Sequence, residues 1–178
     1  VRENYPDCLI VGPSTTDSHV LSAGPGQAKG GAGIGDILPS CPTAALLEGH
    51  QVKLDHFTYH FYNGCSDRLA SVMPEAHWAP EEADSEAYLA HAGNGARAYA
   101  LYRDKYVPGG QMWITEAGDA GGGGDTWAST YLDVLRTLNE LGDFATVTDG
   151  IVFHNTLCSS DYGFLQHGTF DPRPNYFS

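Results

Sequence analysis

The stretch MWITEAGDAGGGGDTW, residues 112–127, joins an apolar run, a single glutamate, a glycine tract and a polar segment that can start a helix. A short apolar run bounded by turn residues is typical of a buried strand, and we predict one at 111–115. Glu116 follows this strand directly, so its backbone should be well fixed. The sequence therefore predicts one carboxylate at a strand end, beside a loop that has almost no side chains.

The same order of strand and helix recurs on both sides of this stretch. Strands are predicted at 9–14, 54–64, 111–115 and 150–157, and helices at 42–50, at 80–106 and after Asp125. Asp125 can cap the last helix. The apolar residues of this helix recur with a helical period, which stops at Gly142. They are Trp127, Tyr131, Leu135, Leu138 and Leu141. Such alternation predicts an α/β fold with a parallel sheet or a (β/α) barrel.

The length of the chain fits only part of such a barrel. The 178 residues are enough for one domain with a core, but an eightfold barrel needs about 250 residues, and four βα steps are half of it. The chain also opens with VRENYPD, which is charged and lacks Met. We therefore expect residues 1–178 to be a piece of a longer protein.

Charge and composition exclude several classes of function. Nine basic residues stand against 22 acidic ones, a net charge of −13, which argues against nucleic acid and strongly polyanionic partners. No apolar run approaches the roughly 20 residues of a membrane span. The glycine-rich segment 22–36 has neither the GK[ST] of a P-loop nor the GxGxxG spacing of a dinucleotide-binding loop. It is predicted to be a surface loop.

No cofactor and no metal site are expected. The four cysteines contain no CxxC, which disfavours structural zinc, and they permit disulfides without requiring them. His56 and His60 have the spacing of a helical zinc pair, but in a strand these positions lie roughly 13 Å apart. Asn139-Glu140 imitates the Asn-Glu pair of many glycosidases, yet it falls within the last predicted helix, where we expect it to be solvated.

Polar groups gather where the predicted strands end, which is where active sites of α/β folds lie. The strand ends carry Gly12-Pro13-Ser14, His60–Asn63, Glu116 and His154–Thr156. A carboxylate kept ionised by hydrogen bonds can act as a nucleophile. His60 and Tyr62 alternate to one face of their strand, so either could orient Glu116. The alternative is a glutamate that only pairs with a base or caps a loop.

Three blocks carry a family resemblance: YHFYNG at 59–64, WITEAGDAGGGG at 113–124 and DYGFLQHGTFDPRPNYFS at 161–178. Together they resemble the second half of the catalytic barrel of heparanase-like glycoside hydrolases, a family of endo- and exo-β-glucuronidases. The resemblance implies a (β/α)8 TIM barrel of which residues 1–178 cover about the last four βα units. It also implies that the N-terminal half of the barrel and a C-terminal β-sandwich lie outside this chain.

The resemblance assigns expected roles in a retaining reaction. Glu116 matches the nucleophile, and His60 and Tyr62 match the pair beside it, with Tyr62 hydrogen-bonding the carboxylate. Asn155 falls near a family glutamine. The acid/base glutamate of the family lies upstream of this chain, and no residue here fits that role. We therefore expect an enzyme whose 178-residue piece alone is inactive.

The glycine tract gains an expected role from the same resemblance. Gly122 and Gly123 match glycines whose backbone N–H groups bind the carboxylate of the uronic acid, and Tyr162 matches a tyrosine that contacts it. The expected substrate is a weakly charged β-glucuronide in an oligosaccharide or polysaccharide. A related barrel glycosidase acting on a neutral sugar and a non-catalytic carbohydrate-binding relative are the alternatives. By resemblance the protein would be secreted, either extracellular or lysosomal or vacuolar.

Overall fold

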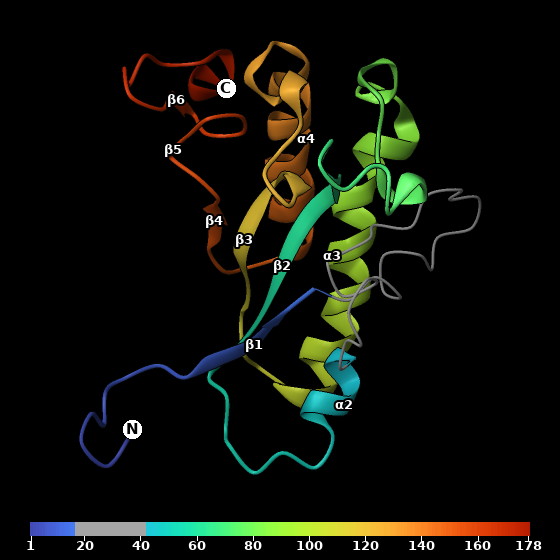
Figure 1. The fold of residues 1–178 in the computed structure, drawn as a ribbon. Helices are drawn as coiled ribbons and strands as arrows, with labels where there is room; N and C mark the ends of the chain where they lie inside the picture. Colours follow the sequence, from blue (N-terminus) through green and yellow to red (C-terminus); the bar gives the residue numbers. More distant parts are fainter. Residues whose placement is uncertain (17–41) are drawn as a thin grey trace.

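The fold is an α/β arrangement built on one parallel sheet (Figure 1). It is a computed structural model that describes residues 1–16 and 42–178, so the expected loop at 22–36 and Cys41 lie outside the described residues. The strands, in sheet order, are β1 (Val11–Thr15), β2 (His56–Cys65), β3 (Met112–Gly121) and β4 (Val152–His154). All neighbouring pairs run parallel, which confirms the prediction of a parallel α/β sheet.

Helices follow the strands in the chain. The α-helices are α2 (Thr43–Leu47), α3 (Glu86–Tyr106) and α4 (Leu132–Val147), and 3₁₀ turns occupy Pro74–Ala76, Pro80–Glu82, Thr126–Ser129 and Pro174–Phe177. Helices α3 and α4 pack on each other and cover the same face of the sheet. The core between these layers contains Phe57, Tyr59, Phe61, Tyr99, Met112, Ile114 and Phe144. The opposite face of β2 and β3 carries the polar residues of the candidate site.

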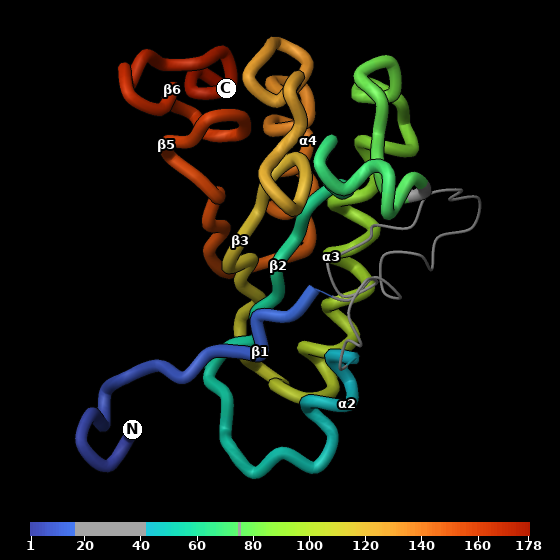
Figure 2. Tube along the Cα trace, viewed as in Figure 1, coloured from blue at the N-terminus to red at the C-terminus, as the bar shows by residue number. Residues whose placement is uncertain are grey.

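The last segment of the chain returns to the carboxyl end of β2 and β3 (Figure 2). It contains the two short strands β5 (Cys158–Ser159) and β6 (Leu165–Gln166), which pair with each other. None of the described helices is long and apolar enough to cross a membrane. Three of the four cysteines are described: Cys8 and Cys158 are free thiols, and the buried Cys65 donates a hydrogen bond to the carbonyl oxygen of Met73 at 3.4 Å.

Helix α3 starts later than predicted and passes through its glycines. Pro80–Glu82 forms a separate 3₁₀ turn, and Ser85 caps α3 by accepting a hydrogen bond from the backbone N–H of Tyr88. A Cβ atom on Gly93 would lie 2.8 Å from the carboxylate of Asp143 in α4. Glycine at this position therefore allows the two helices to approach closely, and it does not interrupt the helix.

Helix α4 buries the face opposite to its apolar stripe. Tyr131, Leu135, Leu138 and Leu141 are between 46% and 80% exposed, and the helix continues past Gly142 to Val147. The buried face holds Arg136, which donates hydrogen bonds of 2.5 Å to Asp133 and to Glu140. A buried charge needs such partners to be stable in the interior. The prediction that Glu140 is solvated was therefore wrong.

Candidate active site

An irregularity in the strand pairing places Glu116 on the polar face of the sheet. Tyr59 pairs with Ile114, but the next residue of β2, His60, pairs with Glu116, so Thr115 is an extra residue on β3. Strict alternation would turn Glu116 toward the helices, on the same side as Ile114. The extra residue resets the alternation, and Ala117 takes the buried position instead.

The sequence analysis predicted that the strand ends just before Glu116, but in the structure the strand continues past this residue. Strand β3 continues to Gly121, and β2 continues past His60 and Tyr62 to Cys65. Glu116 therefore stands within a strand, paired with His60 of β2, and its neighbours Ile114 and Ala117 pair with β4 on the other side. This placement is more rigid than a strand end beside a loop.

The carboxylate of Glu116 is the last acceptor in a hydrogen-bonded chain that begins at Asn155 and passes through Tyr62. The hydroxyl of Tyr62 donates to Oε2 of Glu116 at 2.6 Å, and Nδ2 of Asn155 donates to that hydroxyl at 2.8 Å. Nδ1 of His60 lies 3.6 Å from the same carboxylate oxygen. The expected hydrogen bond between Tyr62 and Glu116 is thus present, and Asn155 joins it from the segment after β4.

Burial defines the protonation of the two groups beside Glu116. Burial raises the pKa of Tyr62 further above its usual value, with the nearby Glu116 carboxylate acting in the same direction. Tyr62 therefore remains a hydrogen-bond donor over the physiological range. Burial also lowers the pKa of His60, although the charge of Glu116 opposes this shift. At neutral pH His60 is a neutral imidazole, and its contact with Glu116 is not an ion pair.

Glycines of β3 make room for the ring of Tyr62. A Cβ atom on Gly118 would lie 3.2 Å from Cε1 of Tyr62, and one on Gly121 would lie 3.6 Å from Cγ of the same ring. A side chain on Gly118 would press on the ring and on the carbonyl oxygen of Asn155, also at 3.2 Å, whereas a Cβ atom on Gly121 would make an ordinary contact. Gly118 therefore helps to set the geometry of the carboxylate contact.

The glycine tract turns sharply after β3. Gly122, Gly123 and Gly124 have φ values of 96°, 124° and 77°, a region that side-chain-bearing residues rarely adopt. Within residues 1–16 and 42–178, the backbone N–H groups of Gly122 and Gly123 have no hydrogen-bond acceptor. Exposed N–H groups that succeed one another in a turn are suited to bind an anion.

Tyr162 lies directly against this turn. A Cβ atom on Gly124 would lie 2.5 Å from Cβ of Tyr162, so only glycine permits the contact. The loop that carries Tyr162 is held by the buried guanidinium of Arg173, which donates to the carbonyl oxygens of Asp161 and Gly163, both at 2.9 Å. The structure thus brings Tyr162 to the glycine tract, as the placement of these residues in the resemblance implies.

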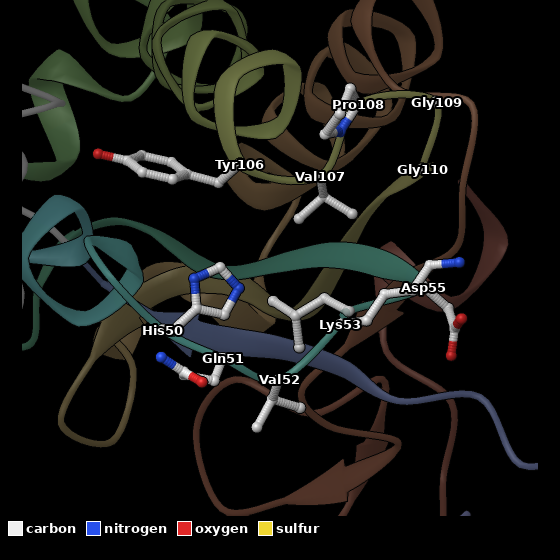
Figure 3. A pocket seen from close by; sticks show the side chains of 11 residues that line it. His50, Gln51, Val52, Lys53, Asp55, Tyr106, Val107, Pro108, Gly109 and Gly110 are labelled. Carbon is white, nitrogen blue, oxygen red and sulfur yellow. The ribbon is translucent and has the colours of Figure 1, made fainter.

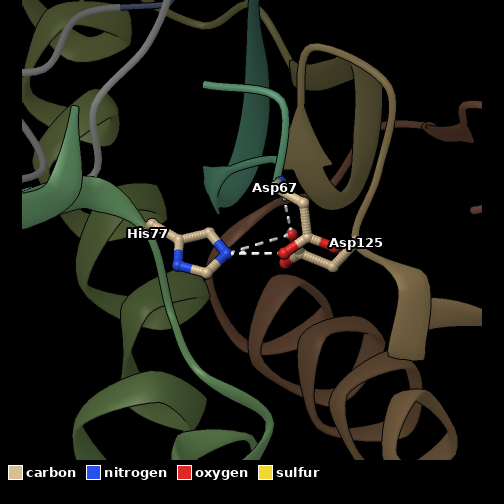
Figure 4. Close-up of side chains that lie close together, drawn as sticks. All are labelled: Asp67, His77 and Asp125. Atoms are coloured by element: carbon tan, nitrogen blue, oxygen red, sulfur yellow. Dashed lines mark hydrogen bonds and ion pairs between the residues drawn. The ribbon is translucent and has the colours of Figure 1, made fainter. Parts of the chain in front are cut away.

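A cluster that the sequence analysis missed lies beside the tract (Figure 4). Nε2 of His77 lies 2.9 Å from Oδ1 of Asp67 and 3.6 Å from Oδ1 of Asp125. Asp125 does not cap the helix that follows, because its carboxylate accepts a hydrogen bond from the backbone N–H of Asp67 instead. One ligand atom from each of the three residues could share a cation, but the contacts among them already account for their arrangement.

A pocket of about 540 Å³ lies elsewhere, at the amino ends of β2 and β3 (Figure 3). It is lined by residues 50–55 and 106–110. None of the candidate site residues contributes to it. Since ligands of α/β sheets bind at the carboxyl ends of the strands, this pocket is not the candidate active site.

Comparison with known proteins relates the chain to glycosidases. No protein-family model matches it. Heparanase-like protein 1 from Arabidopsis thaliana is 26% identical over 126 residues, which cover 70% of this chain and 22% of that protein. Baicalin-beta-D-glucuronidase from Scutellaria baicalensis is 33% identical over 127 residues, which cover 68% of this chain and 22% of that protein.

The two matches support the resemblance drawn from the sequence: the chain is related to heparanase-like glycosidases. It spans about a fifth of the length of these curated relatives, since the matched residues are 22% of each.

Proposed function

We propose that residues 1–178 form the nucleophile-bearing part of a (β/α)8 barrel that cleaves β-glucuronides with retention of configuration. The observation that carries this proposal is the hydrogen bond of 2.6 Å from Tyr62 to Glu116, on the sheet face opposite to the helices. In a barrel the helices lie outside, and that opposite face lines the interior. The names of the two relatives, a heparanase-like protein and a glucuronidase, support the same class of reaction.

In the proposed reaction Glu116 attacks the anomeric carbon of the sugar and forms a glycosyl ester. The hydroxyl of Tyr62 holds the attacking carboxylate in one orientation, and Asn155 fixes that hydroxyl. Retaining glycosidases need a second carboxyl group about 5–5.5 Å from the first, which protonates the leaving oxygen. We assign that group to a part of the protein outside residues 1–178. This segment alone would therefore not hydrolyse the substrate.

The proposed substrate carries a carboxylate of its own. The N–H groups of Gly122 and Gly123, which have no acceptor in the part of the chain that the structure describes, and the adjoining Tyr162 would bind the uronic acid while Glu116 reacts with its ring. The net charge of −13 disfavours heavily sulfated polymers. We therefore propose a weakly charged β-glucuronide of an oligosaccharide or polysaccharide, processed outside the cell or in a lysosome or vacuole.

The test uses the full-length enzyme and a chromogenic aryl β-glucuronide. Glu116→Gln should lower kcat by about a thousandfold or more, because the amide cannot form the ester intermediate. Glu81→Gln, a change at an exposed acid, is the matched control and should keep full activity. Equal melting temperatures of the variants would show that the fold is intact.

Covalent trapping separates the nucleophile from a merely structural glutamate. A 2-fluoro-glucuronyl fluoride should add its sugar mass to the peptide that contains Glu116. Labelling of another carboxylate, or ordinary turnover by Glu116→Gln, would contradict the assignment. Faster cleavage of an aryl β-glucoside than of the glucuronide would favour the neutral-sugar alternative, and no turnover of either would favour a binding protein.

A further inference from the structure

The guanidinium group of Arg68 lies against the glycine tract. The position that a Cβ atom of Gly123 would take is 2.8 Å from Cζ, 2.9 Å from Nη2 and 3.1 Å from Nη1 of Arg68. A side chain at residue 123 would therefore occupy the space of the guanidinium. Because Gly123 has none, a permanent cation lies against a residue whose backbone N–H, like that of Gly122, has no acceptor among the described residues.

The loop that carries Arg68 is fastened to both ends of the glycine tract. Before the tract, the backbone N–H of Ser66 donates to the carbonyl oxygen of Gly121 at 2.9 Å. After it, the N–H of Asp67 donates to Asp125 at 3.0 Å, and the N–H of Thr126 donates to Asp67 at 3.1 Å. These bonds fix the backbone on the N-terminal side of Arg68, so the side chain starts from a defined place.

The protein partner of Arg68 holds it only loosely. Nη2 of Arg68 lies 3.6 Å from Oδ2 of Asp161, and the two side chains are 66% and 36% exposed. Exposed pairs of this kind contribute about 0–1 kcal/mol, so a ligand carboxylate could replace Asp161 at little cost. Asp161 directly precedes Tyr162, which places this pair beside the same turn.

Arg68 differs from the two buried arginines near this end of the sheet. Arg136 is enclosed by Asp133 and Glu140, and Arg173 is bound by the carbonyl oxygens of its loop. Neither guanidinium is open to a ligand, since each residue is at most 6% exposed. Arg68 therefore combines a permanent charge, an open position and contact with the glycine tract.

We propose that Arg68 determines specificity for acidic sugars by binding the substrate carboxylate together with the N–H groups of Gly122 and Gly123. Guanidinium and carboxylate match in shape and form two parallel charge-assisted hydrogen bonds. This inference rests on the proposed glycosidase function and adds to it the residue that separates glucuronides from neutral sugars.

The experiment compares two aryl glycosides with the same leaving group in the full-length enzyme. Arg68→Gln should raise KM for the β-glucuronide about tenfold, the effect of losing one pair worth about 1.4 kcal/mol. It should change kcat/KM for the β-glucoside less than about twofold. Arg68→Lys should recover part of the loss, because the charge is kept and the fork geometry is not. Arg97→Gln, at an exposed arginine of α3, is the matched control.

A binding measurement keeps the inference testable without turnover. D-Glucuronate should raise the melting temperature of the wild-type protein more than D-glucose does, and Arg68→Gln should remove that difference. An equal loss on both glycosides, or an unchanged KM for the glucuronide, would overturn the role of Arg68. The proposed function fails separately, if the wild type shows no glucuronide turnover or if Glu116→Gln remains active.

Discussion

The hydroxyl of Tyr62 donates a hydrogen bond of 2.6 Å to Oε2 of Glu116. The two residues come from neighbouring parallel strands and are 54 positions apart in the chain. Because burial keeps the phenol protonated, Tyr62 donates in this bond and Glu116 accepts. This relationship makes Glu116 an oriented carboxylate within a paired strand, and it leads to the first two predictions.

Tyr62→Phe in the full-length enzyme should lower kcat on an aryl β-glucuronide by about 10- to 100-fold, since the ring stays in place and the carboxylate loses its orienting donor. KM should change much less. Steady-state kinetics on the purified variant measure both values, and Tyr176→Phe, at an exposed tyrosine, is the control. A wild-type kcat would show that the hydrogen bond has no part in catalysis.

Asn155→Ala should have a smaller effect in the same direction, because Asn155 reaches Glu116 only through the hydroxyl of Tyr62. The two changes should also be non-additive, as expected for members of one hydrogen-bonded chain. The double variant Tyr62→Phe, Asn155→Ala should therefore be about as slow as Tyr62→Phe alone. Independent losses that multiply in the double variant would mean that Asn155 acts by another route.

The reversed face of α4 gives a prediction about stability. Arg136→Met leaves Asp133 and Glu140 buried without their cation and should cost about 3–5 kcal/mol of unfolding free energy. Leu138→Gln, two residues further on and on the exposed face of the same helix, where Leu138 is 50% exposed, should cost about 0.5 kcal/mol or less. Urea unfolding of the full-length protein at neutral pH compares the two. A larger loss for Leu138→Gln would contradict the placement of the charged face in the interior.

Stability should fall as the pH rises from 6.5 to 8.5. Burial raises the pKa of Asp119 to about 7 and that of Asp125 to about 8, whereas the unfolded carboxyls titrate near 4. Each group therefore contributes stability that is complete below about pH 4 and is lost as the pH rises through its folded pKa. The pKa of His154 is lowered to about 4 by burial, so its contribution is lost only as the pH falls below about 6.5.

The window above pH 6.5 thus excludes His154 and contains the two aspartates together with Glu140, whose pKa burial raises to about 7. Melting temperatures of the full-length protein across this window provide the measurement. Asp125→Asn should remove much of the decline, because each carboxyl that stays protonated in the folded state accounts for about 1.4 kcal/mol per pH unit. An unchanged decline in this variant would assign the pH dependence to other groups.

The alternation of strands and helices could be read from the sequence because apolar runs and turn residues mark each element. The shared face of His60 and Tyr62 also followed, since side chains alternate along a strand. The buried face of α4 could not be read in this way. Its leucines keep the period expected of a core-facing stripe, but the two acidic partners of Arg136 let a charged side chain take the interior.

Two features of the site depend on contacts between distant segments. The pairing irregularity at Thr115 is visible only when β3 lies beside β2. The approach of Arg68 to Gly123 and the meeting of Asp67 with His77 arise where loops adjoin after folding. No local pattern in the sequence marks these contacts, because each residue involved is typical of an ordinary surface loop.

The extra residue at Thr115 also matters for any attempt to build this site into another protein. A protein engineer who copied the side chains of Glu116 and Tyr62 onto a regular, evenly paired barrel would turn the carboxylate outward, into the layer occupied by the helices. The extra residue of β3 relative to β2 at this point has to be copied together with the two side chains. The position of Glu116 on the polar face thus depends on the uneven pairing of β2 and β3 as much as on the identity of the residue.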